Sequence, residues 1–566
     1  MRTAEAIFAP ARVRMTALPG GGLEVVSLVE ATPPPVSTLS WLCAAAERTP
    51  DAPVLTWCAE DGSRSALSYG DAWQDVQTLA TGLRASGHRR GDRVVTLARN
   101  GPGSFLLAHA AMLAGMIWAP VAPQYAAPGA DPARLRSVLD TLEPALIFID
   151  DREDSPGAPD DATVLIGDDG LARLRAAASG VPPALEEISS TDPAKVLLTS
   201  GSTGAPKAVI QTHVMVAANV QATVDVWPFF LREPPVLVDW LPWNHSFGGN
   251  SNLNLVLAGG GVLHIDESRG LPGTLATTIA NIVRFRPTYY AAVPAVFAAM
   301  LPHLEGDPEF RSALFERAQV LFSAGAAMSA DTFERLRAAS LTVRDTPIPV
   351  LSGWGSTEVG PGATIVHTAS SQPGWIGEPL PGVTVRMAPV GEKHELRVRG
   401  HSVTPGYWGD PVRSREIFDE DGFYRSGDAG VLVDERRPEL GFRFDGRIAE
   451  DFKLANGSWV NTQRLRDEIL AAAGGAVRDV VVAGPDRPHL LALVWLADDA
   501  EIDLDDLVAR HAFGRRGQTN VLRGAVALGA PDPEELSPKG QLRPNVVLSR
   551  RVRLLDDAYA RMESTR

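Results

Sequence analysis

Cysteine is scarce in this sequence, because its 566 residues include only Cys43 and Cys58. Two cysteines make neither a disulfide framework nor a zinc-ligand pattern, and neither one lies in a segment with other catalytic features. Both are therefore interpreted as packed thiols.

Positive charge is scarce as well, since the formal net charge is −15. This balance argues against nucleic acid and anionic membrane surfaces as partners. An acidic chain can still bind a polyanion if it gathers a few cations locally. The cations that matter most are Lys207, Arg447, Lys453 and Lys539.

No apolar run in the sequence is typical of a membrane span. The longest run, residues 105–123, contains His109 and two prolines, and its pattern predicts a buried helix followed by a strand. The first fifteen residues contain no signal-peptide apolar core. We therefore expect a soluble cytoplasmic protein without a membrane partner, present as a monomer or a homodimer.

Internal repeats, coiled-coil heptads and long low-complexity tracts are absent from the sequence. From about residue 40 to residue 365, strand-like runs such as DRVVTLA alternate with helix-like runs such as SFLLAHAAMLAG, which predicts parallel sheets flanked by helices. Residues 374–444 contain short strands with frequent glycine and proline and predict a β-rich subdomain. After Gly446, a helix, strand and strand pattern predicts a compact α+β domain.

The length of the chain exceeds what one hydrophobic core usually supports, so at least two domains are expected. The sequence predicts an α/β fold, with a large N-terminal domain over residues 1–446 that includes the β-rich subdomain. A small α+β C-terminal domain is expected over residues 447–566.

The segment VLLTSGSTGAPKAVIQTH, residues 196–213, concentrates hydrogen-bond donors after a strand-like run. Glycines let backbone N–H groups turn toward a ligand, and hydroxyls and a lysine add donors and charge, so this is a candidate phosphate-binding loop. It is not a Walker loop, because four residues do not separate its first glycine from a Gly-Lys-Ser/Thr. A Ser/Gly-rich surface turn is the alternative. The candidate donors are Thr199, Ser200, Gly201, Ser202, Thr203, Gly204 and Lys207.

Four further segments carry side chains that suit a nucleotide. LSGWGSTEVGPG, residues 351–362, offers a flat indole for a purine, hydroxyls for phosphate and a carboxylate for a hard divalent cation. In GFYRSGDAG, residues 422–430, Asp428 can accept hydrogen bonds from a ribose diol. Arg447 and Lys453 are the cations of the third segment, FDGRIAEDFKLANGSWV, and Lys539 is the cation of the fourth, LSPKGQLRPN. The candidates in the first of these segments are Trp354, Gly355, Ser356, Thr357 and Glu358.

Together and in this order, the five segments resemble the signature motifs of the adenylate-forming superfamily of acyl-CoA synthetases, adenylation domains and luciferases. The resemblance runs nearly end to end. It implies that the glycine-rich loop binds pyrophosphate, that residues 354–358 hold adenine, phosphate and Mg²⁺, and that Asp428 binds ribose. It also implies that Lys539 contacts the reacting carboxylate and the α-phosphate of ATP.

Within the superfamily, the chain looks most like feruloyl-CoA synthases, on the segments VDWLPWNHSFGGNSN, IDESRG, AVPAVF, AGAAMS and FDGRIAEDFKLANGSWV. The resemblance places His245 at the mouth of an acid pocket, and we expect aromatic walls from Trp243 and Phe247. A core histidine satisfied by a backbone group is the alternative for His245. The AGAAMS segment also fits a tight strand-to-helix turn, and the resemblance implies that it lines the adenine through Gly325, Ala326 and Ala327.

Two positions depart from the superfamily pattern. Most relatives carry Asp or Lys as the hinge residue two positions after the arginine of the Gly-Arg pair, where this chain has Ala449. Most also carry glycine before the catalytic lysine and arginine three positions after it, whereas here Lys539 precedes Gly540 and Arg543 lies four positions away. Both departures look like features of the feruloyl-type subfamily. They affect the identity of the hinge residue and the assignment of Lys539 as the catalytic lysine, and they do not affect the reaction class.

The implied reaction activates a carboxylic acid with ATP and then joins it to coenzyme A. Attack of the carboxylate on the α-phosphate gives acyl-AMP and pyrophosphate, but both reactants are anions. Bringing two unit charges to about 4 Å costs about 4 kcal/mol at an effective dielectric of about 20. Mg²⁺ on Glu358, the loop donors, Lys207 and Lys539 would supply the opposing charge.

The second step needs only a thiolate close to the mixed anhydride. The resemblance implies a mobile C-terminal domain that changes orientation between the steps. Since Ala449 carries no charge, we expect Glu450 or Asp451 to take part in the hinge.

The preferred acid is an aromatic propenoic acid such as ferulate. A fatty-acyl or benzoate-type ligase stays open, because one sequence does not show the depth of a pocket. An enzyme that loads an amino acid onto a carrier protein is disfavoured, since no acidic anchor for an α-amine stands beside WNHSFGG. A P-loop phosphotransferase is strongly disfavoured by the missing Walker spacing. The hypothesis of an adenylate-binding protein without catalysis is supported only by Ala449 and by the shifted position of Lys539.

Overall fold

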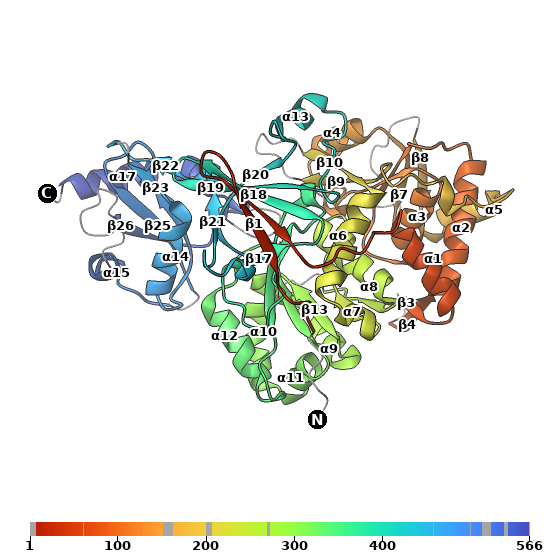
Figure 1. The fold of residues 1–566 in the computed structure, drawn as a ribbon, viewed down its shortest axis with the longest axis horizontal. Coiled ribbons are helices and arrows are strands. Elements are labelled where there is room, and N and C mark those ends of the chain that lie inside the picture. Colours follow the sequence, from red (N-terminus) through yellow and green to blue (C-terminus); the bar gives the residue numbers. More distant parts are fainter. Residues whose placement is uncertain are drawn as a thin grey trace.

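The computed structural model describes residues 7–59, 62–127, 129–150, 162–199, 206–268, 272–456, 458–497, 500–511, 522–536 and 542–564. The fold is α/β, as the sequence predicts, with helices packed around mixed sheets (Figure 1). Within the described ranges, no helix combines the length and the apolarity that a membrane span requires.

One sheet carries the strands that flank the candidate phosphate loop, in the order β10-β9-β6-β5-β7-β8. Strands β5 to β9 pair in parallel, and β10 runs antiparallel to β9. The apolar run at residues 105–123 forms helix α3, Pro102–Leu113, and then β6, which confirms the predicted helix and strand. The strands are Arg93–Leu97 (β5), Ile117–Pro120 (β6), Pro144–Ile149 (β7), Thr163–Ile166 (β8), Pro193–Thr199 (β9) and Lys207–Thr212 (β10).

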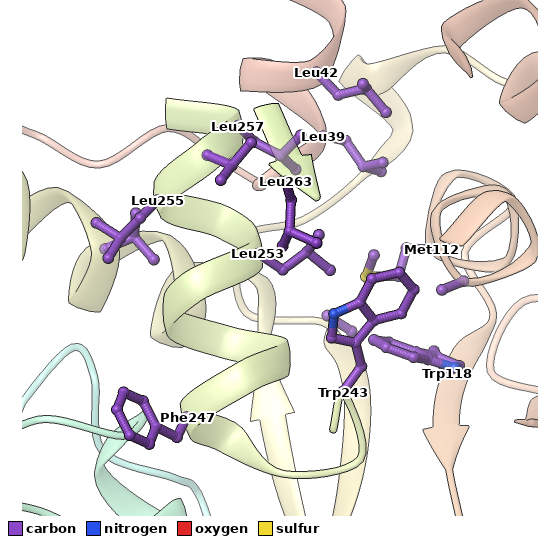
Figure 2. Packing of buried hydrophobic residues seen from close by; sticks show 14 of the residues in the cluster. Leu39, Leu42, Met112, Trp118, Trp243, Phe247, Leu253, Leu255, Leu257 and Leu263 are labelled. Atoms are coloured by element: carbon purple, nitrogen blue, oxygen red, sulfur yellow. The ribbon is translucent and has the colours of Figure 1, made fainter. Parts of the chain in front are cut away.

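A second sheet of order β11-β12-β3-β4 lies beside the main hydrophobic core. Helix α8, Leu253–Gly259, packs against α1, Leu39–Arg48, and against α6, His213–Val226. Figure 2 shows Trp243 in the same packed cluster as Met112, Trp118 and Leu253. Trp243 and Phe247 are both buried members of this cluster, so their role as aromatic walls of an acid pocket stays a prediction. The strands are Val236–Asp239 (β11), Val262–Ile265 (β12), Pro53–Cys58 (β3) and Arg64–Ser68 (β4).

The longest sheet joins parts of the chain that are far apart in sequence, in the order β1-β2-β18-β19-β20-β21-β17-β16-β15-β14-β13. Strands β13, β14 and β15 pair in parallel, and the remaining pairs are antiparallel. The predicted β-rich region thus extends a parallel sheet instead of standing alone. The strands are Tyr289–Ala292 (β13), Val320–Ser323 (β14), Val350–Trp354 (β15), Thr364–Ile365 (β16), Trp375–Pro379 (β17), Val383–Val390 (β18), Lys393–Gly400 (β19), Tyr424–Leu432 (β20) and Phe442–Arg447 (β21).

The first two strands of this sheet were not predicted from the sequence. Strands β1, Val13–Ala17, and β2, Leu23–Ser27, form a hairpin, and β2 pairs with β18. The pairing is between segments hundreds of residues apart, so no local pattern announces it.

The elements after Asp451 have their own sheets and hydrophobic clusters. Helix α14, Thr462–Ala472, and strands β24, Val477–Ala483, and β25, Leu490–Leu496, are the helix and two strands that the sequence predicts there. Strand β26, Leu522–Leu528, completes a three-stranded sheet. The division into domains at residues 446 and 447 stays a prediction.

Candidate active site

Trp354, Asp428 and Arg447 come together on strands of the long sheet. Trp354 is the last residue of β15, and Asp428 on β20 faces Arg447 on β21 as an antiparallel partner. The Trp354 indole Nε1 donates a hydrogen bond to Asp428 Oδ2 at 2.9 Å, and Arg447 Nε lies 3.5 Å from Asp428 Oδ1. Three candidate nucleotide-binding residues from three separate motifs are therefore in direct contact.

The electrostatics of Asp428 reflect this contact. Burial raises the pKa of Asp428, while Arg447 and the Trp354 indole oppose the rise and the charge of Glu358 adds to it. The Asp428 N–H donates to Ser426 Oγ at 3.0 Å, which fixes the backbone of the turn. A carboxylate has about four acceptor positions, so the two side-chain contacts leave capacity for the hydroxyls of a diol.

The turn after β15 carries the other residues of this motif. A Cβ on Gly355 would lie 2.0 Å from the Pro361 carbonyl oxygen, so no larger residue fits there. Ser356 follows, and Thr357 and Glu358 begin the 3₁₀ turn Thr357–Val359. The short turn therefore places two hydroxyls and a carboxylate in three consecutive positions beside Trp354.

Glu358 is bonded to a residue that the sequence did not single out. The Tyr407 hydroxyl donates to Glu358 Oε1 at 3.0 Å, and both side chains are buried. Lys207 Nζ lies 5.4 Å from the centre of the Tyr407 ring, a cation–π distance. Burial and Glu358 raise the pKa of Tyr407, so it remains a protonated donor at neutral pH. Tyr407 thus links the phosphate-loop lysine to the candidate metal-binding carboxylate.

Glu358 is the candidate ligand for Mg²⁺. In the part of the chain that the structure describes, no group of three or more His, Cys, Asp or Glu side chains could hold a metal. Mg²⁺ is usually bound through one or two carboxylates together with substrate phosphates and waters. A single buried carboxylate beside a nucleotide site therefore suits this ion.

Most of the predicted phosphate loop falls outside the described residues. Thr199 ends β9 and Lys207 begins β10, and the two are antiparallel partners. The residues of the predicted site that lie outside the described ranges are Ser200, Gly201, Ser202, Thr203, Gly204 and Lys539.

Gly325, Ala326 and Ala327 form an exposed turn between β14 and helix α12, Ala330–Ser340. Because β14 and β15 are parallel neighbours, this turn and the turn after Trp354 leave the sheet at the same edge. The geometry suits a role beside adenine and also a plain strand-to-helix turn.

His245 precedes a π-helix, Phe247–Asn252. Its Nδ1 accepts a hydrogen bond from the Phe247 N–H at 3.2 Å, so the neutral imidazole carries its proton on Nε2. The Phe247 ring meets the Phe322 ring edge to face, with centres 5.7 Å apart. The roles of His245 and Phe247 as the mouth and wall of an acid pocket stay a prediction.

The segment after Arg447 connects the long sheet to the C-terminal elements. Lys393 Nζ on β19 lies 2.6 Å from Asp451 Oδ2, and the Thr462 N–H and hydroxyl donate to Asp451 Oδ1 at 3.2 and 3.1 Å. Asp451 therefore bridges the long sheet and the start of α14. Ala449 and Lys453 are exposed on either side of it.

We predict that Asp451→Pro slows thioester formation at least about 10-fold more than adenylation. Asp451 has φ −79°, which proline tolerates, so the substitution stiffens the backbone at this residue. Asp451→Ala is the matched control, because it removes the carboxylate without stiffening the backbone. The two half-reactions are measured separately, as pyrophosphate release and as thioester formation from supplied acyl-AMP. Equal losses in both half-reactions for the proline variant would contradict a hinge at this residue.

Comparison with known proteins gives consistent matches. The family of AMP-binding enzymes matches residues 42–408. A feruloyl-CoA synthase from Amycolatopsis sp is 29% identical over 462 residues, covering 79% of this chain and 87% of the relative. The long-chain-fatty-acid–CoA ligase FadD15 of Mycobacterium bovis is 26% identical over 502 residues, covering 78% of this chain and 79% of that one.

A solved structure shares the fold. The crystal structure of ATP-bound MatB from Rhodopseudomonas palustris superimposes with a TM-score of 0.71 at 23% identity, covering 91% of this chain and 99% of that chain.

Proposed function

Because the chain belongs to the family of AMP-binding enzymes, we propose that it is an ATP-dependent, AMP-forming acid–CoA ligase whose acid is an aromatic propenoic acid such as ferulate. The observation that carries the proposal is the contact of Trp354 with Asp428 and of Asp428 with Arg447, next to the buried Glu358. This set offers one suitable group to each part of a magnesium nucleotide.

The nucleotide side of the site follows from these contacts. The Trp354 indole is oriented by its hydrogen bond to Asp428, so its face can pack against a purine. Asp428 would accept hydrogen bonds from the ribose hydroxyls. Lys207 would approach the phosphates from β10, and Mg²⁺ held by Glu358 would neutralise phosphate charge.

The reaction then proceeds in two displacements. A carboxylate oxygen of the acid attacks the α-phosphorus of ATP and displaces pyrophosphate, which forms acyl-AMP. The sulfur of coenzyme A, as a thiolate, attacks the acyl carbon and displaces AMP. No side-chain nucleophile takes part, so the contribution of Lys207, Thr357 and Lys539 is to hold anions together and stabilise developing charge.

The identity of the acid rests on two supports. The segment with His245 and Phe247 resembles that of feruloyl-CoA synthases, and a feruloyl-CoA synthase is among the matched relatives. Phe247, two residues after His245, and the Phe322 ring that it contacts would provide aromatic surface for the acid. A fatty acid is the second candidate, because the chain is also similar to a long-chain-fatty-acid–CoA ligase.

A panel of acids tests the proposal through pyrophosphate release with ATP and Mg²⁺. We expect ferulate, p-coumarate and caffeate to give values of kcat/KM at least about 10-fold above those of saturated C8 to C16 acids, since pocket shape discriminates by such factors. Benzoate separates a shorter aromatic pocket from a cinnamate pocket.

Each outcome of the panel has a distinct meaning. A higher kcat/KM for octanoate than for ferulate would replace the aromatic acid by a fatty acid. Release of pyrophosphate without thioester formation would favour transfer to a carrier protein. Binding of AMP without pyrophosphate release from any acid would refute a ligase.

A further inference from the structure

A buried lysine on β9 has no acidic partner among the residues that the structure describes. Lys195 is 3% exposed, and no carboxylate among the described residues pairs with it. Burial lowers the pKa of its ammonium to about 7. Removing a cation from water without a counter-ion is unfavourable, so polar groups around Lys195 must stabilise it.

Those groups belong to the π-helix that follows His245. Lys195 Nζ donates to the Gly249 carbonyl oxygen at 3.1 Å and to Asn250 Oδ1 at 2.9 Å. The ammonium also lies 4.9 Å from the centre of the Trp118 ring. π-Helical turns are rare in proteins, and those that occur within helices often lie at functional sites. Lys195 therefore supplies donors to the helix that carries the candidate wall of the acid pocket.

This helix is packed directly on backbone. A Cβ on Gly249 would lie 2.1 Å from the Trp243 carbonyl oxygen, and a Cβ on Gly248 would lie 2.5 Å from the Leu241 carbonyl oxygen. The two glycines thus let the helix approach the segment that precedes His245. A change in the register of the helix would move Phe247 with it.

Two amides continue the hydrogen bonds toward the nucleotide side. Asn250 Nδ2 donates to Gln211 Oε1 at 2.8 Å, and Gln211 Nε2 donates to the Thr357 carbonyl oxygen at 3.0 Å. Asn250 and Gln211 are both 0% exposed. Every donor points the same way, from the Lys195 ammonium to the Thr357 carbonyl, so the bonds reinforce one another.

We propose that Lys195, Asn250 and Gln211 form a positioning relay that holds the π-helix of the acid pocket in register with the turn of Thr357 and Glu358. The relay residues act through these two segments and do not touch the reacting atoms. The consequence for acid binding rests on the proposed function, whereas the coupling between the two segments does not.

Hydrogen exchange of the full chain without ligand tests the coupling. In Lys195→Met, which removes the ammonium at similar volume, we expect amide exchange at residues 247–252 and at residues 357–359 to speed up together by about 10-fold or more. Exchange in β24 should not change. Gln211→Met removes the acceptor for Asn250 Nδ2 and the donor to the Thr357 carbonyl but leaves the bonds from Lys195 to the π-helix in place. It serves if the first variant fails to fold, with faster exchange expected at residues 357–359.

Thr81→Val is the matched control, because it removes a partly buried hydrogen bond, from Thr81 Oγ1 to the Gln77 carbonyl at 2.7 Å, inside helix α2, Tyr69–Ala85. It should leave both segments unchanged. Faster exchange only at residues 247–252 in Lys195→Met would reduce the lysine to a local support and overturn the relay. No change, or an equal rise throughout the chain, would overturn it as well.

A kinetic comparison then separates the relay from a purely structural role. With the acid that the parent protein activates best, Lys195→Met is expected to raise the KM for the acid about 10-fold and the KM for ATP by less than about twofold. An equal rise in both values would overturn the effect on acid binding. A parent protein that activates no acid would refute the proposed function, while hydrogen exchange would still decide the relay.

Discussion

Glu358→Gln is expected to slow pyrophosphate release by about 100- to 1,000-fold while the protein stays folded. Glutamine keeps a side-chain oxygen that can accept the hydrogen bond from Tyr407, so the packing around this buried residue is preserved. What it removes is a negative charge at the proposed magnesium position, where charge stabilisation has effects of this size. The melting temperature should be unchanged or higher, because burying a neutral amide costs less free energy than burying a charged carboxylate.

Tyr407→Phe is the matched control for this prediction. It removes the hydrogen bond to Glu358 and keeps the ring near Lys207, so we expect a loss of about 10-fold or less. Pyrophosphate release is measured over a titration of Mg²⁺ for the parent protein and both variants. A near-normal rate for Glu358→Gln at the normal magnesium requirement would show that Glu358 is not the ligand.

Local patterns in the sequence were sufficient for the elements with strong periodicity. Helix α3 and strand β6 form as predicted, and so do the helix and strands after residue 460. When one face of an element or a whole segment is buried, its sequence shows a recognisable pattern of apolar residues. The N-terminal hairpin was missed, because β1 and β2 are short and their sheet partner β18 lies far along the chain.

The site shows the same division between local and non-local information. Trp354, Asp428 and Arg447 stood in recognisable motifs, and the structure brings them into contact. Tyr407 was missed because a single tyrosine in a stretch rich in glycine and proline has no pattern of its own.

Lys195 was missed for a different reason. It lies in KVLLT, within strand β9, where most side chains are buried, so alternation along the strand does not tell which side chain faces a polar partner. The one available signal was a lysine inside an apolar strand, which is unusual for a buried position. Its partners Asn250 and Gln211 belong to two other elements, and only the fold brings them to it.

Lys539→Ala is expected to slow adenylation by about 100- to 1,000-fold and to leave thioester formation largely intact. Lys539 lies outside the described residues, so the prediction rests on the LSPKGQLRPN motif and on charge. If the ammonium meets the carboxylate and the α-phosphate only while charge is redistributed, its loss raises the barrier of that step and changes substrate binding much less. Pyrophosphate release from ATP and ferulate measures the first step.

The second step is measured by giving the variant synthetic feruloyl-AMP and coenzyme A. Because the C-terminal domain is proposed to take another orientation for this step, Lys539→Ala should convert the adenylate at close to the parent rate. Lys453→Ala is the comparison variant, since Lys453 is an exposed cation two residues after Asp451 and should affect adenylation less. Equal loss of both half-reactions in Lys539→Ala would refute the division of labour between the two orientations. Unchanged rates in both assays would indicate that Lys539 is a solvated surface lysine. Lys453 would then be the next candidate for the charge-stabilising role.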